Sequence, residues 1–144
     1  MTTILAIPGS WRSGSYNLAL ARAAQALAPA GCTVELASIA AIPVYDGDNE
    51  AAQGVPVPVA ELKDRIAAAD ALLLVTPEYN NSVPGPLKNA IDWLSRPASD
   101  LARVFGDKPT GLIGASPGPG GTRLAQAAWL PVLRLLGTRP WFGK

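Results

Sequence analysis

The feature that most constrains the fold is an unbroken apolar run, residues 71–75, that leads into a turn and a helix. Five apolar residues without polar alternation indicate a strand that is buried on both faces of a parallel sheet. The turn contains two prolines and a glycine, and Pro86 suits the start of a helix because it has no N–H to leave unpaired. Apolar residues then recur at helical spacing over residues 87–94, until Pro97 ends the pattern.

The same succession of strand, loop and helix recurs along the chain, which predicts an α/β fold with a parallel sheet. Strands are expected at residues 3–7, 33–37, 71–75 and 109–115. Helices are expected at residues 18–28 and 59–69, after Pro86, and at residues 123–136. Residues 42–58 are expected to form a loop, and residues 98–107 a polar link in which Asp100 and Arg103 are solvated charges.

Length and charge restrict the class of protein. A chain of 144 residues is predicted to form a single domain over residues 1–144. Its 12 basic and 11 acidic residues give a net charge of +1, which provides no electrostatic basis for binding nucleic acid or an anionic membrane. No segment carries the pattern of a secretory signal or a membrane span, so a cytoplasmic protein is expected.

The residue types that bind metals or act as nucleophiles are scarce. Histidine is absent, which excludes Ser-His-Asp and Cys-His catalysis and any histidine-ligated metal. Cys32 is the single cysteine and cannot form an internal disulfide. Asp46 and Asp48 are interpreted as turn residues because they lack the ligand spacing of a calcium loop. No metal is predicted, and chemistry supplied by a bound organic cofactor is favoured.

A hydroxyl-rich loop, residues 10–17, joins the first predicted strand to its helix. Such a loop suits a phosphate, because the first N–H groups of a helix lack partners and the helix dipole is positive there. Ser15 occupies the position of the essential lysine of a nucleotide triphosphate loop, and the GxGxxG dinucleotide pattern is absent. The remaining candidate ligand is a small phosphate monoester, which neutral donors would hold with Arg12 as the nearby cation. Capping preferences alone favour the alternative that Ser15 and Asn17 merely cap the helix.

Three motifs stand at the ends of the first, third and fourth predicted strands. They are GSWRSGSYN at residues 9–17, PEYNNSVPGPLKNAIDW at residues 77–93 and GAS at residues 114–116. Together they resemble the NADPH-dependent FMN reductase family, flavodoxin-like flavoproteins that include quinone, azo and chromate reductases. The first motif matches every fixed position of the family pattern GSxRxxSxN, which holds the FMN phosphate in that family. The third resembles the family segment that precedes a glycine-rich turn beside the flavin ring.

The resemblance implies a flavodoxin-like, doubly wound parallel sheet with strand order 2-1-3-4-5. It covers nearly all of this chain, whereas family members usually continue further. Residues 138–144 supply at most the start of a fifth strand, so that strand and a C-terminal helix are expected to be truncated. The resemblance also implies a homodimer or homotetramer. Trp93 is expected either at such an interface or in the core.

FMN is the cofactor that the resemblance implies, with NADPH or NADH as electron donor. The expected reaction passes hydride through flavin N5 to a small-molecule acceptor: a quinone, an azo or nitro compound, chromate or free flavin. The chain itself is expected to supply no catalytic side chain. The residues expected to bind the cofactor are Ser10, Arg12, Ser15, Tyr16, Asn17, Pro77, Glu78, Tyr79, Asn80 and Ser116.

Two alternatives to a reductase remain open. One is a flavodoxin-like electron carrier or flavin-binding module without reductase activity, against which the net charge of +1 argues because such carriers use an acidic surface to steer their partners. The other is a cofactor-free structural protein that has kept the motifs. Spectra and NAD(P)H oxidation would separate these alternatives from the reductase.

Overall fold

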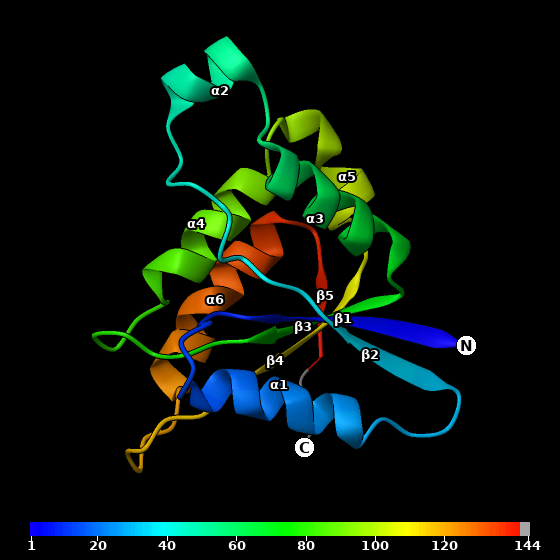
Figure 1. The fold of residues 1–144 in the computed structure, drawn as a ribbon, viewed down its shortest axis with the longest axis vertical. Helices are drawn as coiled ribbons and strands as arrows, with labels where there is room; N and C mark the ends of the chain where they lie inside the picture. Colours follow the sequence, from blue (N-terminus) through cyan, green and yellow to red (C-terminus); the bar gives the residue numbers. More distant parts are fainter. Residues whose placement is uncertain (142–144) are drawn as a thin grey trace.

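The computed structural model describes residues 1–141, which form a parallel β-sheet with helices on both faces (Figure 1). Within this part of the chain the sheet has five strands in the order β2-β1-β3-β4-β5. The strands are β1 (Thr2–Pro8), β2 (Cys32–Leu36), β3 (Ala71–Val75), β4 (Pro109–Ile113) and β5 (Arg139–Pro140). Every neighbouring pair is parallel, which confirms the predicted flavodoxin-like α/β fold and the strand order 2-1-3-4-5.

The fifth strand is short. Its two residues pair with the start of β4, Arg139 opposite Pro109 and Pro140 opposite Thr110. This agrees with the prediction that the last segment supplies the start of a fifth strand. The remainder of that prediction, over residues 142–144, lies outside the described residues.

Helices connect the strands and form the two outer layers. Within residues 1–141 they are α1 (Tyr16–Ala26), α2 (Gly47–Gln53), α3 (Val57–Ala68), α4 (Gly85–Leu94), the 3-10 helix η1 (Ala98–Asp100), α5 (Leu101–Val104) and α6 (Arg123–Leu135). The α1 helix lies on one face of the sheet, and α3, α4 and α6 lie on the other (Figure 1). In the described part of the chain, no helix has the length and apolar character needed to cross a membrane.

The main core lies between the sheet and the layer of α3, α4 and α6. Leu72 and Leu74 of β3 are 2% and 1% exposed, and they belong to one apolar cluster with Ile91 of α4 and Trp129 of α6. Leu73 lies on the opposite face of the strand and is half-buried. The central strand is therefore fully covered on one face and partly covered on the other. This burial fixes the sheet whose edge carries the loops described below.

Two regions that were predicted to be irregular contain short helices. The α2 helix lies within the expected loop, residues 42–58, and η1 and α5 lie within the expected link, residues 98–107. Asp46 caps α2, because its Oδ1 accepts a hydrogen bond from Asp48 N at 2.9 Å, and this fits its interpretation as a turn residue. Helices of three to seven residues are too short to produce a periodic apolar pattern, so sequence periodicity did not reveal them.

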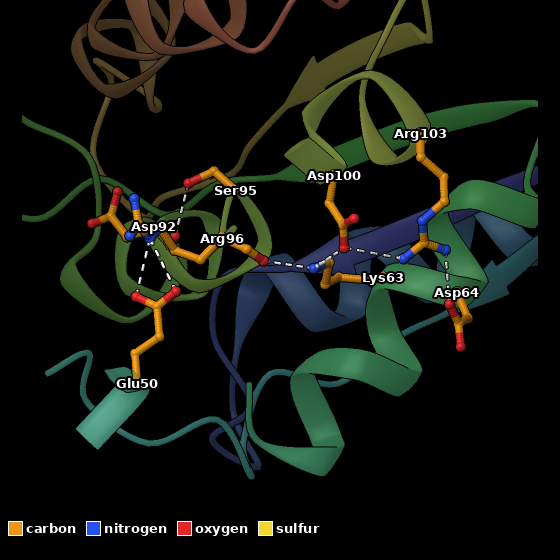
Figure 2. Close-up of polar contacts among 8 residues, drawn as sticks. All are labelled: Glu50, Lys63, Asp64, Asp92, Ser95, Arg96, Asp100 and Arg103. Carbon is orange, nitrogen blue, oxygen red and sulfur yellow. Dashed lines mark hydrogen bonds and ion pairs between the residues drawn. The ribbon is translucent and has the colours of Figure 1, made fainter. Parts of the chain in front are cut away.

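A polar network joins α3 to the segment that follows α4 (Figure 2). Lys63 of α3 is 3% exposed, and its ammonium group donates to Arg96 O at 2.5 Å and pairs with the Asp100 carboxylate. Asp100 also contacts Arg103 at 3.4 Å, and Arg103 reaches Asp64 at 2.8 Å. The prediction that these are solvated charges therefore fails for Asp100, which is only partly exposed and compensates a buried ammonium group, whereas Arg103 is exposed as expected. A buried lysine from a distant part of the chain requires the compensating carboxylate.

A second ion pair fastens α2 to the end of α4 (Figure 2). Arg96 Nε lies 3.0 Å from Glu50 Oε2, and the Tyr45 hydroxyl donates to the same oxygen at 2.8 Å. The hydrogen bond from Tyr45, followed by the contact with Arg96, holds the pKa of the Glu50 carboxyl below its usual value.

Trp93 lies in the core of the chain. Its side chain is 1% exposed, its indole N–H donates to Pro43 O at 3.0 Å, and its ring meets the Tyr45 ring edge-on with 4.9 Å between centroids. Asn89 holds the same segment, since its amide accepts from Tyr45 N and donates to Pro43 O, both at 2.8 Å. Of the two roles left open for Trp93, the structure therefore favours the core.

Candidate functional site

The loops that follow β1, β3 and β4 lie at the same edge of the sheet (Figure 1). They line a common cleft of about 140 Å³. Its lining residues are Ser10, Arg12, Ser15, Tyr16, Asn17, Pro77, Glu78, Tyr79, Ala115, Ser116 and Pro117. Nine of the ten residues predicted to bind a cofactor therefore line one cleft, and the tenth, Asn80, does not.

The loop between β1 and α1 presents hydrogen-bond donors to this cleft. Ser10 and Ser15, which both line it, are 7% and 5% exposed. The Ser15 oxygen caps α1 by accepting from Leu18 N at 3.2 Å, which leaves its O–H free to donate. Tyr16 and Asn17 begin the helix, so their N–H groups have no partner within it. Hydroxyl donors thus lie beside the positive end of a helix dipole.

Arg12 adds a positive charge to the same loop. A Cβ placed on Gly14 would lie 3.0 Å from Arg12 Nη1, so the guanidinium group extends over Gly14. Arg12 takes part in none of the ion pairs found among residues 1–141. An arginine without an acidic partner at this position can pair with an anionic ligand.

Asn17 connects the first loop to the third. Its Nδ2 donates to Ala115 O at 3.0 Å, and its Oδ1 accepts from Ala115 N at 2.9 Å. The side chain is 4% exposed. Ser15 therefore caps the helix, as the capping alternative expects, while its O–H stays available to a ligand. The same alternative is wrong for Asn17, whose amide bonds to a residue 98 positions away.

The loop after β3 places Tyr79 at the cleft by means of a tight turn. Tyr79 N donates to Ser82 O at 3.2 Å, and Ser82 N donates to Tyr79 O at 3.1 Å. The two central residues, Asn80 and Asn81, have φ angles of 52° and 59°. Positive φ at both central positions is the pattern of a type I′ turn, in which asparagine is favoured. Asn80 thus shapes the turn while its side chain lies outside the cleft.

Glu78 connects the second loop to the third. Its Oε2 accepts hydrogen bonds from Leu124 N at 2.9 Å and from Ala125 N at 3.0 Å, at the start of α6. The helix has no side-chain cap of its own at Thr122. A carboxylate at a helix N-terminus satisfies unpaired donors and is favoured by the helix dipole.

The loop after β4 is closed by its own serine. Ser116 Oγ donates to Gly121 O at 2.9 Å and lies 3.3 Å from Gly118 O. Just before it, Gly114 permits a close approach of neighbouring chain, because a Cβ there would collide with Thr122 Oγ1 and with Thr76 O. A glycine is therefore required where the end of β4 passes these two groups.

A larger apolar cleft, about 380 Å³, lies along β4, β5 and α6. Its lining includes Leu73, Ile113, Leu130 and Trp141 and, among residues 1–141, contains no charged residue. It shares no lining residue with the cleft at the three loops. In the described part of the chain, no group of three or more His, Cys, Asp or Glu residues is arranged to hold a metal ion.

The family model described as NADPH-dependent FMN reductase matches residues 2–142. The chain belongs to this family. Membership confirms the resemblance drawn from the three motifs and, through the family description, FMN and NADPH as its characteristic cofactors. The family description names a reductase, which favours the expected enzyme class over the electron-carrier alternative.

Individual proteins similar to this FMN reductase family member are also named as reductases. An NAD(P)H-dependent FMN reductase of Pseudomonas aeruginosa is 47% identical over 137 residues, which cover 95% of this chain and 72% of that protein. A 2-hydroxy-1,4-benzoquinone reductase of Burkholderia sp. is 44% identical, over 86% of this chain and 66% of that protein. A quinone reductase of Escherichia coli K12 is 51% identical, over 65% of this chain and 50% of that protein.

A solved structure supports the fold of this family member. The flavoenzyme NAD(P)H:(acceptor) oxidoreductase of Paracoccus denitrificans superimposes with a TM-score of 0.89 at 40% identity, covering 99% of this chain and 76% of that one. The chain thus spans between half and about three quarters of the length of these relatives.

Sequence reasoning missed two features of the site. The hydrogen bonds from Asn17 and Glu78 to the third loop could not be predicted from the spacing of nearby residues, because their partners lie 46 to 98 residues away in the sequence. The tight turn at residues 79–82 had a signal, since an Asn-Asn pair between an aromatic residue and a serine favours positive φ at two successive positions.

Proposed function

We propose that this chain is an FMN-dependent NAD(P)H oxidoreductase that reduces quinones or related small-molecule acceptors. The observation that carries the proposal is the meeting of three loops at one cleft, with donors from Ser10, Ser15 and Arg12 beside the start of α1. These donors suit a phosphate monoester, the only strongly anionic group of FMN. Names of relatives as FMN and quinone reductases support the assignment.

The residues fit both ends of the cofactor. At the phosphate end, Ser10 and Ser15 offer hydroxyl groups, Arg12 offers a positive charge, and the first N–H groups of α1 are unpaired. At the ring end, Pro77 and Tyr79 offer an apolar and aromatic surface. The other predicted binding residues that line the cleft are Tyr16, Asn17, Glu78 and Ser116. Asn80 is not included, since it does not line the cleft.

The size of the cleft suggests an accessible cofactor. Its volume of about 140 Å³ is smaller than the roughly 300 to 1,000 Å³ typical of small-molecule pockets. Part of a bound FMN would therefore lie outside it, where a nicotinamide donor and an acceptor can reach it in turn. Tyr79, 44% exposed, stands at this open side.

When bound, FMN would supply the redox chemistry, which is the passage of hydride from NAD(P)H through flavin N5 to the acceptor. The chain's own residues bind and orient the reactants. Hydride transfer itself needs no acid or base, so we assign no catalytic side chain. Besides quinones, we propose azo and nitro compounds, chromate and free flavin as acceptors, because an exposed reduced flavin can reduce each of them.

Three further predictions remain proposals supported by the sequence. They are a single domain over residues 1–144, a cytoplasmic location, and assembly as a homodimer or homotetramer. Gel filtration with light scattering would measure the assembly state directly.

The test is spectroscopic. The purified chain is incubated with FMN, freed of unbound flavin and titrated anaerobically with NADPH and then NADH. We expect retained flavin absorption that bleaches with one nucleotide and returns on addition of a benzoquinone. Retained flavin that neither nucleotide bleaches would favour the electron-carrier alternative. A colourless chain whose melting temperature does not rise with FMN would overturn the proposal, since a ligand of the native state must stabilise it.

A further inference from the structure

We infer that Asn17 and Glu78 are positioning residues that hold the third loop, residues 115–125, at its two ends, rather than ligands of the cofactor. The inference rests on the proposed function for what the cleft binds. It concerns how the cleft keeps its shape. Neither role was visible in the sequence, where both residues were assigned to cofactor binding.

The first end of the loop is fixed by Asn17. Its amide donates to Ala115 O at 3.0 Å and accepts from Ala115 N at 2.9 Å, so it satisfies both polar groups of one residue just beyond β4. The amide is 4% exposed, and both its oxygen and one N–H are engaged. A side chain committed in this way holds the second residue beyond β4 and ties it to the start of α1.

The second end is fixed by Glu78. One carboxylate oxygen accepts from Leu124 N and Ala125 N, at 2.9 and 3.0 Å, where α6 begins. Thr122 provides no side-chain cap, so Glu78 supplies the acceptor that this helix end needs. The charge that looked available for a ligand is thus committed to a helix terminus.

Between these two fixed points the loop is closed internally. Ser116 Oγ donates to Gly121 O at 2.9 Å, and Ser116 lines the cleft. Asn17 belongs to the first loop and Glu78 to the second, so each of the other loops holds one end of the third. Because these bonds are made to backbone groups of the third loop, they set the width of the cleft before any ligand enters. Such preorganisation strengthens binding, because less conformational entropy is lost when the ligand binds to a loop that is already ordered.

The experiment compares FMN with riboflavin, which lacks the phosphate. Arg12→Ala serves as the reference for a phosphate ligand and should weaken FMN while leaving riboflavin unchanged. Asn17→Ala should weaken both flavins by about the same factor, roughly tenfold, because it loosens the loop rather than removing a phosphate contact. Asn17→Ser replaces Asn17→Ala if the latter does not fold. Loss confined to FMN would overturn the inference for Asn17.

Glu78 is tested by its conservative variant. The amide oxygen of Glu78→Gln can still accept from the start of α6, so this variant should keep flavin affinity within about threefold, while Glu78→Ala should lose roughly tenfold. Equal losses in the two variants would show that the charge itself is needed, and would overturn the positioning role.

A third measurement does not depend on flavin. Amide hydrogen exchange of the flavin-free protein should accelerate in residues 115–125 for Asn17→Ala and Glu78→Ala, but not for Arg12→Ala. Unchanged exchange in that segment would overturn the inference. If the wild-type chain bound no flavin, the proposed function would fail while accelerated exchange in the two variants would still support the role of these residues in holding the loop.

Discussion

The ammonium group of Lys63, 3% exposed, pairs with the carboxylate of Asp100, which is 31% exposed and lies on another helix. Asp100→Asn removes the negative charge and leaves the buried ammonium group of Lys63 without a compensating carboxylate. Lys63→Met removes the buried ammonium group itself and keeps the apolar volume of the side chain. We therefore expect Asp100→Asn to lower the free energy of unfolding more than Lys63→Met does. Urea denaturation of both variants measures the difference.

A control for that pair lies in the same network. Asp64, whose side chain is 73% exposed, contacts Arg103 at 2.8 Å, and exposed ion pairs contribute little. Asp64→Asn should therefore cost less than Asp100→Asn. Equal costs for the two aspartate variants would contradict the importance assigned to the buried partner.

Acid should destabilise the protein through two carboxyl groups. Hydrogen bonds from Tyr45 to Glu50 and from Lys63 to Asp100, each the largest cause, lower the pKa values of these carboxyls below the ordinary 4.5 and 3.8. A carboxyl whose pKa is lower in the folded than in the unfolded state adds stability above its unfolded pKa and loses it as the pH falls through its folded pKa. We expect the free energy of unfolding to fall as the pH drops below about 4.5.

The double variant Glu50→Gln with Asp100→Asn checks this assignment. It should be less stable than the wild type near neutral pH, and its stability should fall less steeply below about pH 4.5, because the two titrating groups are gone. Chemical denaturation at a series of pH values gives both quantities. Identical slopes for variant and wild type would assign acid unfolding to other groups.

Gly114 should tolerate no side chain. A Cβ at this position would collide with Thr122 Oγ1 and with the Thr76 carbonyl oxygen, and the second of these is backbone that cannot turn aside. We expect Gly114→Ala to cost about 3 kcal/mol or more. Gly118→Ala in the same loop is the control, because nothing lies within 4 Å of its added Cβ, and it should change stability by less than about 0.5 kcal/mol. Thermal unfolding of the pair tests the contrast.

The tight turn beside Tyr79 should select its residues by backbone conformation. Asn80 has a φ of 52°, a region that a β-branched residue enters at a cost of about 1 to 2 kcal/mol. Asn80→Val should therefore lower stability by about this amount, whereas Asn80→Gly should be close to neutral. If both variants melted at the wild-type temperature, the positive φ would not constrain this position.

Arg12 should matter for the phosphate. Arg12→Ala should weaken FMN binding by roughly 10- to 100-fold, the value of a charge-assisted hydrogen bond, with little change in stability. Arg22→Ala is a matched control, because Arg22 is an exposed arginine on α1 that does not line the cleft. Fluorescence titration with FMN measures both variants. A loss of similar size for Arg22→Ala would indicate a general effect of charge rather than a local contact.

The sequence by itself determined the order of strands and helices and the three loops of the candidate site. Apolar runs, helical spacing, proline and glycine act over a few residues, so they are readable from local pattern, as for residues 71–75 and Pro86. The helices α2, η1 and α5 were not predicted, because each has too few residues to show a periodic apolar pattern.

Only the tertiary structure decided which polar side chains bond to which distant partners. Asn17 bonds to Ala115, Glu78 caps the start of α6, and Lys63 finds Asp100, each across a long stretch of chain. Such partners are chosen by packing, because a buried amide or charge must be satisfied by whatever group the fold brings within about 3 Å. Local sequence fixes what a side chain can donate or accept, and the folded sheet decides where it does so.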